Sequence, residues 1–447
     1  MTRRHFLGGA VVVGGALLTG CRNSGRSSAK PARTKPPDTR PQPTLPEGIG
    51  AHPEIEHIVV LMMENHSFDN YFGMLGRGDG FAVGADGRPL ASNPNGAGKV
   101  VRAFEMPTPC QLADQPSQSW NASHAQLAGG RMDGFVTSDS GPVAMGYWTE
   151  RTLPYYYALG RTFPIADRYF ASCLASTFPN RRFLQAGSAL GLITNVPPSF
   201  TDPPPPNGTV WDRLNAHGIS WANYYVDLPE IGLFPSVYLA NQARALPMAD
   251  YFTAAKAGTL PAVSLVTPQS VHASEENPQD IQQGESFAAG VINAAMAGPG
   301  WRNTVLVWTY DEHGGYFDHV APPAAVLPDA VAPRLQPGDT PGGYDRYGFR
   351  VPCAVISPFA RRGYVSSVVH DHTSILRLIE TQWNLPAITA RDANASNLMD
   401  MLDLDGPPSF PEPPPMPAPG LSSAPSRCSA TGPGAIPPPG VLQPAAG

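Results

Sequence analysis

Ile58-Val59-Val60-Leu61-Met62-Met63-Glu64-Asn65-His66-Ser67-Phe68-Asp69 is the stretch that decides the fold. Its first six residues are apolar without interruption, which is typical of a strand buried on both faces of a parallel sheet. Three further runs of this kind occupy residues 262–266, 304–309 and 351–357. Apolar residues at helical spacing lie at 281–295 and at 375–382. This alternation predicts an α/β fold with a mostly parallel central sheet flanked by helices.

The composition of the 447 residues limits both the domain plan and the function. With 30 basic and 36 acidic side chains, the formal charge of −6 offers no positive excess for a phosphate backbone, so we expect no nucleic-acid partner. Many of the 52 prolines fall in two stretches without an apolar period. We therefore predict a disordered linker at residues 22–50, a folded body at 51–405 and a disordered tail at 406–447.

The first 21 residues have the features of an export signal. Arg3 and Arg4 precede an apolar run at residues 8–18, which is too short to span a bilayer as a helix, since that takes about 20 apolar residues. A twin-arginine signal explains the pattern. The run closes with Leu18-Thr19-Gly20-Cys21, which resembles a lipobox, whose cysteine is lipidated; an incidental cysteine beside an ordinary cleavage site is the alternative. Lipidation at Cys21 would anchor the protein to the outer face of the cytoplasmic membrane, in the cell envelope.

Acidic side chains follow two of the predicted strands. Glu64 and Asn65 end the first run, and Asp311 and Glu312 follow the run at 304–309. Because ligands bind beyond the carboxyl ends of parallel strands, these oxygen donors favour a divalent metal ion: Ca²⁺, Mg²⁺, Mn²⁺ or Zn²⁺. The alternative is that the acids only cap the helices that follow.

The segment 174–182 and several histidines are further candidates. Ser176 and Thr177 stand before Pro179-Asn180-Arg181-Arg182, so a hydroxyl there is either a helix cap or a nucleophile beside a phosphate-binding helix start. His124, His319 and His372 lie in turn-like surroundings and are either structural residues or proton donors to a leaving group.

Together these segments resemble the bacterial phospholipase C and acid phosphatase family of phosphoesterases, distant members of the alkaline-phosphatase-like superfamily. The resemblance covers residues 55–404. Its motifs are Ile55 to Gly73, Met132-Asp133-Gly134-Phe135, Asp167-Arg168-Tyr169-Phe170, Thr177-Phe178-Pro179-Asn180-Arg181, Tyr310-Asp311-Glu312-His313-Gly314-Gly315 and Asp371-His372-Thr373-Ser374.

The resemblance implies a role for each matching residue. Glu64, Asn65, Asp311 and Glu312 would hold the metal, with Thr177 bridging it as the nucleophile. A histidine, His124 or His319, would protonate the departing alcohol, and His372 is a third catalytic candidate. Asn180, Arg181 and His313 would contact the substrate. The chain departs from the family at Gln118 and at Asn277, or Glu276 if the gap falls otherwise, where relatives carry histidines.

The function expected from these residues is metal-dependent phosphodiester hydrolysis through a phosphothreonine intermediate. The substrate would be phosphatidylcholine or a related phospholipid, cleaved as by a phospholipase C. An acid phosphatase acting on small monoesters is the enzymatic alternative. A surface lipoprotein that binds phosphorylated ligands without turnover is the alternative from another class.

Overall fold

The computed structural model describes residues 34–110, 116–270, 273–277 and 279–420. Residues 35–420 include an eight-stranded sheet in the order β12-β6-β11-β10-β1-β9-β7-β8. Its strands are β1 (His57–Met63), β6 (Ile165–Ala166), β7 (Trp221–Tyr225), β8 (Ala245–Pro247), β9 (Val263–Thr267), β10 (Thr304–Tyr310), β11 (Cys353–Ile356) and β12 (Val365–Ser366). The four strands predicted from apolar runs are β1, β9, β10 and β11.

The centre of the sheet is parallel, as predicted. β1 pairs in parallel with β10 on one side and with β9 on the other. Every residue of β10 is buried, and so is all of β1 except His57, because helices cover both faces. β11 is the exception: it runs antiparallel to both β10 and β6.

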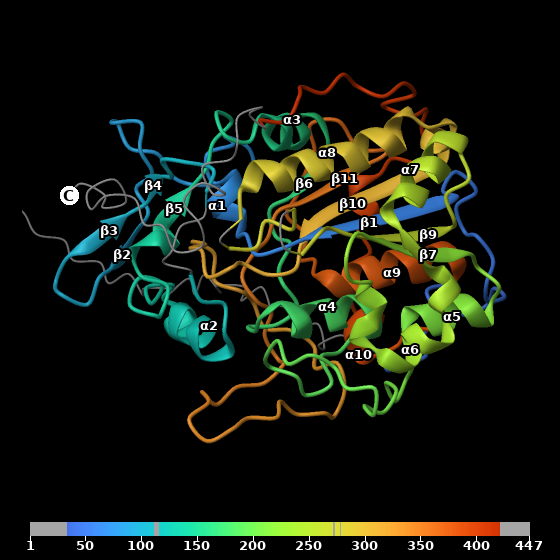
Figure 1. The fold of residues 1–447 in the computed structure, drawn as a ribbon, viewed down its shortest axis with the longest axis horizontal. Coiled ribbons are helices and arrows are strands. Elements are labelled where there is room, and N and C mark those ends of the chain that lie inside the picture. The colour runs from blue at the N-terminus through green and yellow to red at the C-terminus, as the bar shows by residue number, and fades with distance from the viewer. Residues whose placement is uncertain (1–33, 111–115, 271–272, 278, 421–447) are drawn as a thin grey trace, which may run out of the picture. The chain divides into compact units, whose positions relative to one another are not determined.

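Helices lie on both faces of the sheet (Figure 1). One face carries α3 (Pro154–Thr162), α7 (Met248–Ala257) and α8 (Ile281–Ala297), and the other carries α4 (Thr177–Ala186) and α9 (His372–Trp383). α8 and α9 confirm the helices predicted from apolar spacing. The remaining helices are α1 (Phe68–Phe72), α2 (Trp120–Leu127), α5 (Val210–Ala216), α6 (Pro235–Ala240) and α10 (Ala390–Ala393). Two small sheets pair β2 (Ser92–Pro94) with β3 (Val100–Arg102) and β4 (Phe104–Glu105) with β5 (Gly146–Tyr147).

The proline-rich linker is ordered where the structure describes it, which corrects the prediction of disorder for residues 34–50. The Asn384 side chain donates hydrogen bonds to the carbonyls of Gln42, Leu45 and Pro46 at 3.0, 3.0 and 2.9 Å. The backbone amide of Gly48 donates to the carbonyl of Trp383. Extended chain therefore finds partners at the end of α9, although it has no apolar period. Residues 1–33, including Cys21, lie outside the described residues.

The start of the predicted tail is ordered as well. Phe410 is buried beneath the guanidinium of Arg362, and its carbonyl accepts a hydrogen bond from the Trp301 indole at 3.0 Å. The amide of Gly420 donates to the Glu285 carboxylate at 2.8 Å. These contacts correct the prediction of disorder for residues 406–420. Residues 421–447 lie outside the described part. Within that part, no helix is long and apolar enough to cross a membrane.

Candidate active site

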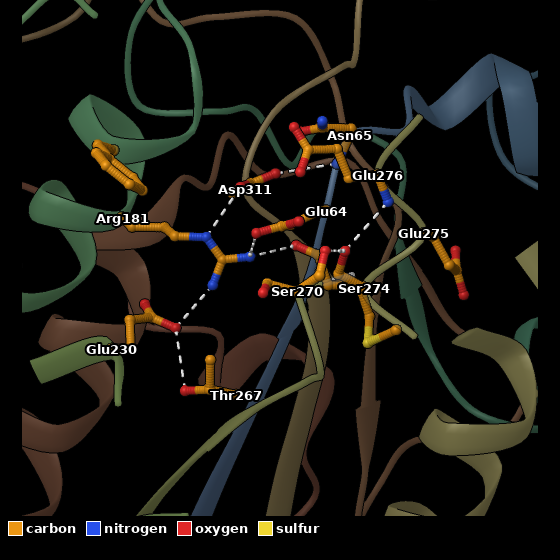
Figure 2. A network of polar contacts seen from close by, with 12 residues as sticks. Glu64, Asn65, Arg181, Glu230, Thr267, Ser270, Ser274, Glu275, Glu276 and Asp311 are labelled. Atoms are coloured by element: carbon orange, nitrogen blue, oxygen red, sulfur yellow. Dashed lines mark hydrogen bonds and ion pairs between the residues drawn. The ribbon is translucent and has the colours of Figure 1, made fainter. Parts of the chain in front are cut away.

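The parallel pairing of β1 with β10 brings the predicted metal ligands together. Met63 is in register with Tyr310, so Glu64 and Asn65 leave the sheet beside Asp311 and Glu312. The backbone amide of Asn65 donates to Asp311 Oδ1 at 3.1 Å (Figure 2). Asn65 has a positive φ of 70°, a conformation that asparagine tolerates better than most residues. The strand ends therefore position these side chains as predicted.

Gly314, which follows Asp311 and Glu312 in the loop after β10, occupies a position that only a glycine fits. Its φ is +64°, and a Cβ atom there would lie 2.0 Å from the carbonyl oxygen of Asn65. The loop after β10 can approach the loop after β1 only because position 314 lacks a side chain. The amide of Gly314 also donates to Glu312 Oε2 at 2.7 Å and so orients that carboxylate.

Arg181 lies at the centre of what we call the Arg181 cluster, which comprises Arg181 and the acids Glu64, Glu230 and Asp311 (Figure 2). Its guanidinium is 2.9 Å from Asp311 Oδ2, 2.7 Å from Glu230 Oε2 and 3.4 Å from Glu64 Oε1. Arg181 is 3% exposed, so all three ion pairs are shielded from water. Arg181, the predicted substrate contact, is thus also paired with the three acids around it.

One guanidinium does not balance the buried acids. Burial raises the pKa of Glu64 to about 8, against the lowering effect of Arg181. Burial, followed by the charge of Asp311, raises the pKa of Glu312 well above its usual range. The raised pKa values reflect an excess of buried carboxyl groups over positive charge, which a bound cation would offset.

Several buried oxygen atoms at this site lack hydrogen-bond partners. Within the described residues these include Glu64 Oε2, Asn65 Oδ1 and Glu312 Oε1. Buried polar atoms are nearly always paired, so unpaired oxygens at adjacent strand ends suit an oxygen-coordinated divalent ion. The residues present therefore fit the predicted metal.

α4 brings Thr177 to the site. Thr177 is the first residue of the helix and lies one turn before Arg181, so the two side chains share a helix face. Ser176 is the N-cap residue, but its side chain makes no capping hydrogen bond. The role of Thr177 as the nucleophile stays a prediction.

Asn180 has a different role from the one predicted. Its Oδ1 accepts from the Cys173 amide at 3.0 Å, and its Nδ2 donates to the Ala175 carbonyl at 2.8 Å and the Ser176 carbonyl at 3.1 Å. The side chain is fully buried. Asn180 therefore holds the loop that leads to Thr177, which corrects its assignment as a substrate contact.

Glu230 and Glu276 are site residues that the sequence analysis did not assign. Glu230 lies in the 3-10 helix η3 (Glu230–Leu233), and no motif marks it. Glu276 lies beside Asn65 (Figure 2) and is partly exposed. The sequence had named Glu276 only as the alternative to Asn277 for a position where relatives carry a histidine.

His372 and His313 are both buried at the edge of the cluster. His372 Nε2 contacts the backbone carbonyl of Asp311 at 2.7 Å, and burial lowers its pKa. His313 Nε2 contacts Gln126 Oε1 at 2.7 Å, its Nδ1 lies 3.2 Å from Glu312 Oε2, and burial lowers its pKa to about 3. These rings orient Asp311 and Glu312. The catalytic role of His372 and the substrate contact at His313 stay predictions.

His124 and His319 are engaged elsewhere. His124 Nδ1 contacts the carbonyl of Trp120 at 2.7 Å, and its ring packs on that indole. His319 Nδ1 lies 2.7 Å from Asp69 Oδ2, and its Nε2 lies 3.3 Å from Asp79 Oδ1. In these described contacts neither ring meets the Arg181 cluster, so the structure gives no support to either as the leaving-group acid.

Asp69, Asp318 and His319 form a group whose ligand atoms all lie within 4.8 Å of one another, close enough to share a metal ion. The Arg350 guanidinium already binds both acids, at 3.1 Å from Asp69 Oδ1 and 2.9 Å from Asp318 Oδ1. We call these residues the Arg350 cluster. Its acids are neutralised internally, so it fits a cation less well than the donors beside Arg181.

Comparison with known proteins places these residues in a family. The model of the Phosphoesterase family matches residues 55–386. Phospholipase C A of Mycobacterium tuberculosis is 30% identical over 410 residues, covering 80% of this chain and 78% of that protein. Non-specific phospholipase C1 of Arabidopsis thaliana is 30% identical over 381 residues, covering 76% and 69%.

Two other matches extend the comparison. Non-hemolytic phospholipase C of Pseudomonas aeruginosa is 30% identical over 376 residues, or 74% of this chain, which spans only 54% of that protein. Among solved structures, a protein of the alkaline phosphatase superfamily from Vibrio parahaemolyticus aligns at a TM-score of 0.38 and 11% identity, over 80% of this chain and 74% of that one. The family match covers both strand ends and the start of α4, and the chain therefore belongs to the Phosphoesterase family, as a hydrolase of phosphate esters.

Proposed function

We propose that the protein is a metal-dependent phosphodiesterase of the phospholipase C type, which forms a phosphothreonine intermediate at Thr177. The observation that carries this proposal is the set of unpaired buried oxygens on Glu64, Asn65 and Glu312. These residues and Asp311 would hold the metal. When bound, the ion would lower the pKa of the Thr177 hydroxyl and offset negative charge on the phosphoryl oxygens.

In the first step, Thr177 Oγ forms a bond to phosphorus while the bond from phosphorus to the leaving alkoxide oxygen breaks. The hydroxyl proton passes to a carboxylate or to water, and the departing oxygen takes up a proton. Water then attacks phosphorus, releases the phosphate product and restores the Thr177 hydroxyl. Arg181 stabilises negative charge on the phosphoryl oxygens through its remaining donor capacity.

Glu276 is our candidate for the leaving-group acid. Burial, then the charge of Asp311, raises its pKa, and Arg181 lowers it less. A carboxyl group with a raised pKa can hold the proton that the leaving oxygen needs. Glu276 would thereby take the place of the histidine that relatives carry.

The relatives named phospholipase C support a phospholipid such as phosphatidylcholine as the substrate class. We test the reaction with phosphatidylcholine, bis-p-nitrophenyl phosphate and p-nitrophenyl phosphate, each with and without chelator. Chelator-sensitive turnover of both diesters is expected. Turnover of the monoester alone would move the protein to the acid phosphatase alternative, and metal binding without turnover would favour the binding lipoprotein.

Thr177→Ala tests the nucleophile. We expect kcat to fall by about 10⁴-fold or more, since loss of a nucleophile removes the covalent route. Thr177→Ser is the matched control, because it keeps a hydroxyl at the start of α4, and it should retain measurable turnover. Full activity in Thr177→Ala would contradict the proposed intermediate.

The proposed location is the outer face of the cytoplasmic membrane, in the cell envelope. It rests on Arg3-Arg4 and on the lipobox that ends at Cys21. Cys21→Ala should release the protein from the membrane fraction, and continued membrane association in a lipid-labelling and fractionation experiment would contradict lipidation at this residue.

A further inference from the structure

A cavity of about 460 Å³ opens beside the Arg181 cluster. One end is polar and is formed by residues that Figure 2 draws: Glu64, Arg181, Glu230, Thr267 and Ser270. The rest is mostly apolar, with several prolines beside Phe178, Phe200, Leu228, Leu233 and Tyr238. This volume falls in the range of about 300–1,000 Å³ that is usual for small-molecule sites.

Large apolar side chains are exposed at the mouth of this cavity. Phe200 is 73% exposed and Leu228 is 67% exposed, and both line it. Val196 and Val226 lie close to them in the sequence and are 61% and 42% exposed. Single exposed apolar residues are ordinary, but a group on two loops around one opening marks an interaction surface.

We propose that this cavity binds the hydrocarbon chain of a lipid phosphoester, while the rim formed by Phe200 and Leu228 lies in the lipid surface. A single opening runs from Glu64 and Arg181, at the edge of the candidate site, to an apolar wall and an apolar mouth. A ligand that fills it carries a phosphate at one end and hydrocarbon at the other, which describes an amphiphile. An apolar segment of a partner protein would leave the polar end unmatched.

This inference rests on the proposed function and adds to it the part of the molecule that recognises the chain. It also accounts for how an apolar substrate leaves a bilayer, because the rim would bring the cavity mouth to the depth of the acyl chains. Burying each exposed rim side chain in lipid removes apolar surface from water and so strengthens binding.

The test uses the full chain carrying Cys21→Ala, so that no lipid anchor contributes to binding. Phe200→Ser and Leu228→Ser are compared with Phe252→Ser and Leu90→Ser. The controls match in residue type and are 40% and 59% exposed, and neither lines the cavity. The readout is turnover of phosphatidylcholine vesicles divided by turnover of bis-p-nitrophenyl phosphate. A second readout, co-flotation with phosphatidylcholine vesicles, needs no turnover.

We expect each rim variant to lower the turnover ratio by about tenfold, as the loss of one buried apolar side chain implies, and to weaken co-flotation. The controls should stay within twofold of the parent chain. Rim variants that match the controls in both readouts would overturn the proposal. If the parent chain hydrolysed neither ester, the proposed function would fail. Co-flotation would then test only the claim that Phe200 and Leu228 lie in the lipid surface. Weaker vesicle binding by the rim variants would support that claim, and unchanged binding would refute it.

Discussion

The Arg181 cluster and the Arg350 cluster are built from the same parts but are completed differently. Each surrounds a buried arginine with carboxylates. In the Arg350 cluster the guanidinium binds Asp69 and Asp318 and donates to the carbonyls of Asp79 and Asp167, and His319 binds the second oxygen of Asp69.

Beside Arg181, in contrast, Glu64 Oε2 and Glu230 Oε1 lack partners among the described residues, as do Asn65 Oδ1 and Glu312 Oε1 next to them. A satisfied buried network stabilises the fold, whereas an unsatisfied one costs free energy unless a ligand completes it. The comparison therefore favours a stabilising role for the Arg350 cluster and supports the proposal that the chemistry takes place beside Arg181.

The same substitution in each cluster gives the largest expected contrast. Asp311→Asn should lower kcat/KM by at least about a hundredfold, because it removes a charged oxygen at the proposed metal site. It should cost less stability than Asp318→Asn, since the Asp311 charge also opposes ionisation of Glu64, Glu276 and Glu312.

Asp318→Asn should lower the free energy of unfolding by about 3 kcal/mol, because it leaves part of the fully buried Arg350 charge unpaired. The molecules that stay folded should keep most of their activity. Denaturant unfolding and diester kinetics on both variants measure the contrast. Equal losses of activity per folded molecule would break the distinction between the clusters.

The next prediction tests Glu276, the proposed leaving-group acid beside the Arg181 cluster. Glu276→Gln removes the proposed proton donor, so we expect kcat to fall by about a hundredfold for an ester with an alkoxide leaving group. The loss should be much smaller for p-nitrophenolate, which departs without a proton. Hydrolysis of both ester types by one enzyme preparation provides the measurement.

Asn277→Ala is the matched control at the neighbouring position. Asn277 accepts a hydrogen bond from the Tyr316 hydroxyl at 3.0 Å, so it has a structural partner. We expect this variant to treat both leaving groups alike. A leaving-group dependence in Asn277→Ala and none in Glu276→Gln would contradict the assignment of Glu276 as the leaving-group acid.

The sequence predicted the parts of the site that depend on strand order and local spacing. Uninterrupted apolar runs identified β1 and β10, and the carboxyl ends of neighbouring parallel strands necessarily bring Glu64 and Asp311 together. Thr177 and Arg181 were named from a family motif at a predicted helix start, and the structure places them one helical turn apart. The antiparallel direction of β11 was not predicted, because an apolar run is the same in either direction.

The roles of individual side chains depend on contacts that no local pattern encodes. Glu230 meets Arg181 from 49 positions away and carries no motif. His372 and His313 matched family motifs, but only the fold shows that their rings are buried against Asp311 and Glu312. His319 follows an aspartate in the sequence, yet its nearest acid in space is Asp69.

The smallest expected effect is the pH dependence of stability that His319 contributes in the Arg350 cluster. Burial lowers the pKa of His319, but the hydrogen bond and charge of Asp69 outweigh it and raise the pKa to about 9. Because the folded pKa exceeds the ordinary value of 6.5, the protonated ring stabilises the folded state fully below pH 6.5, and this contribution is lost as pH rises through 9. The melting temperature of the parent chain should therefore fall between pH 7 and pH 9.5.

His319→Gln should flatten that slope, lowering the melting temperature at pH 7 by about 2 °C and converging with the parent chain above pH 9. Differential scanning calorimetry across this range measures both curves. His217 provides the control: it also contacts a carboxylate, at 3.1 Å from Glu47, but on the surface, where an ion pair contributes little. If His217→Gln flattened the slope of melting temperature against pH as strongly as His319→Gln, the pH dependence would not arise from the Arg350 cluster. The stabilising role proposed for that cluster would then lack support from titration.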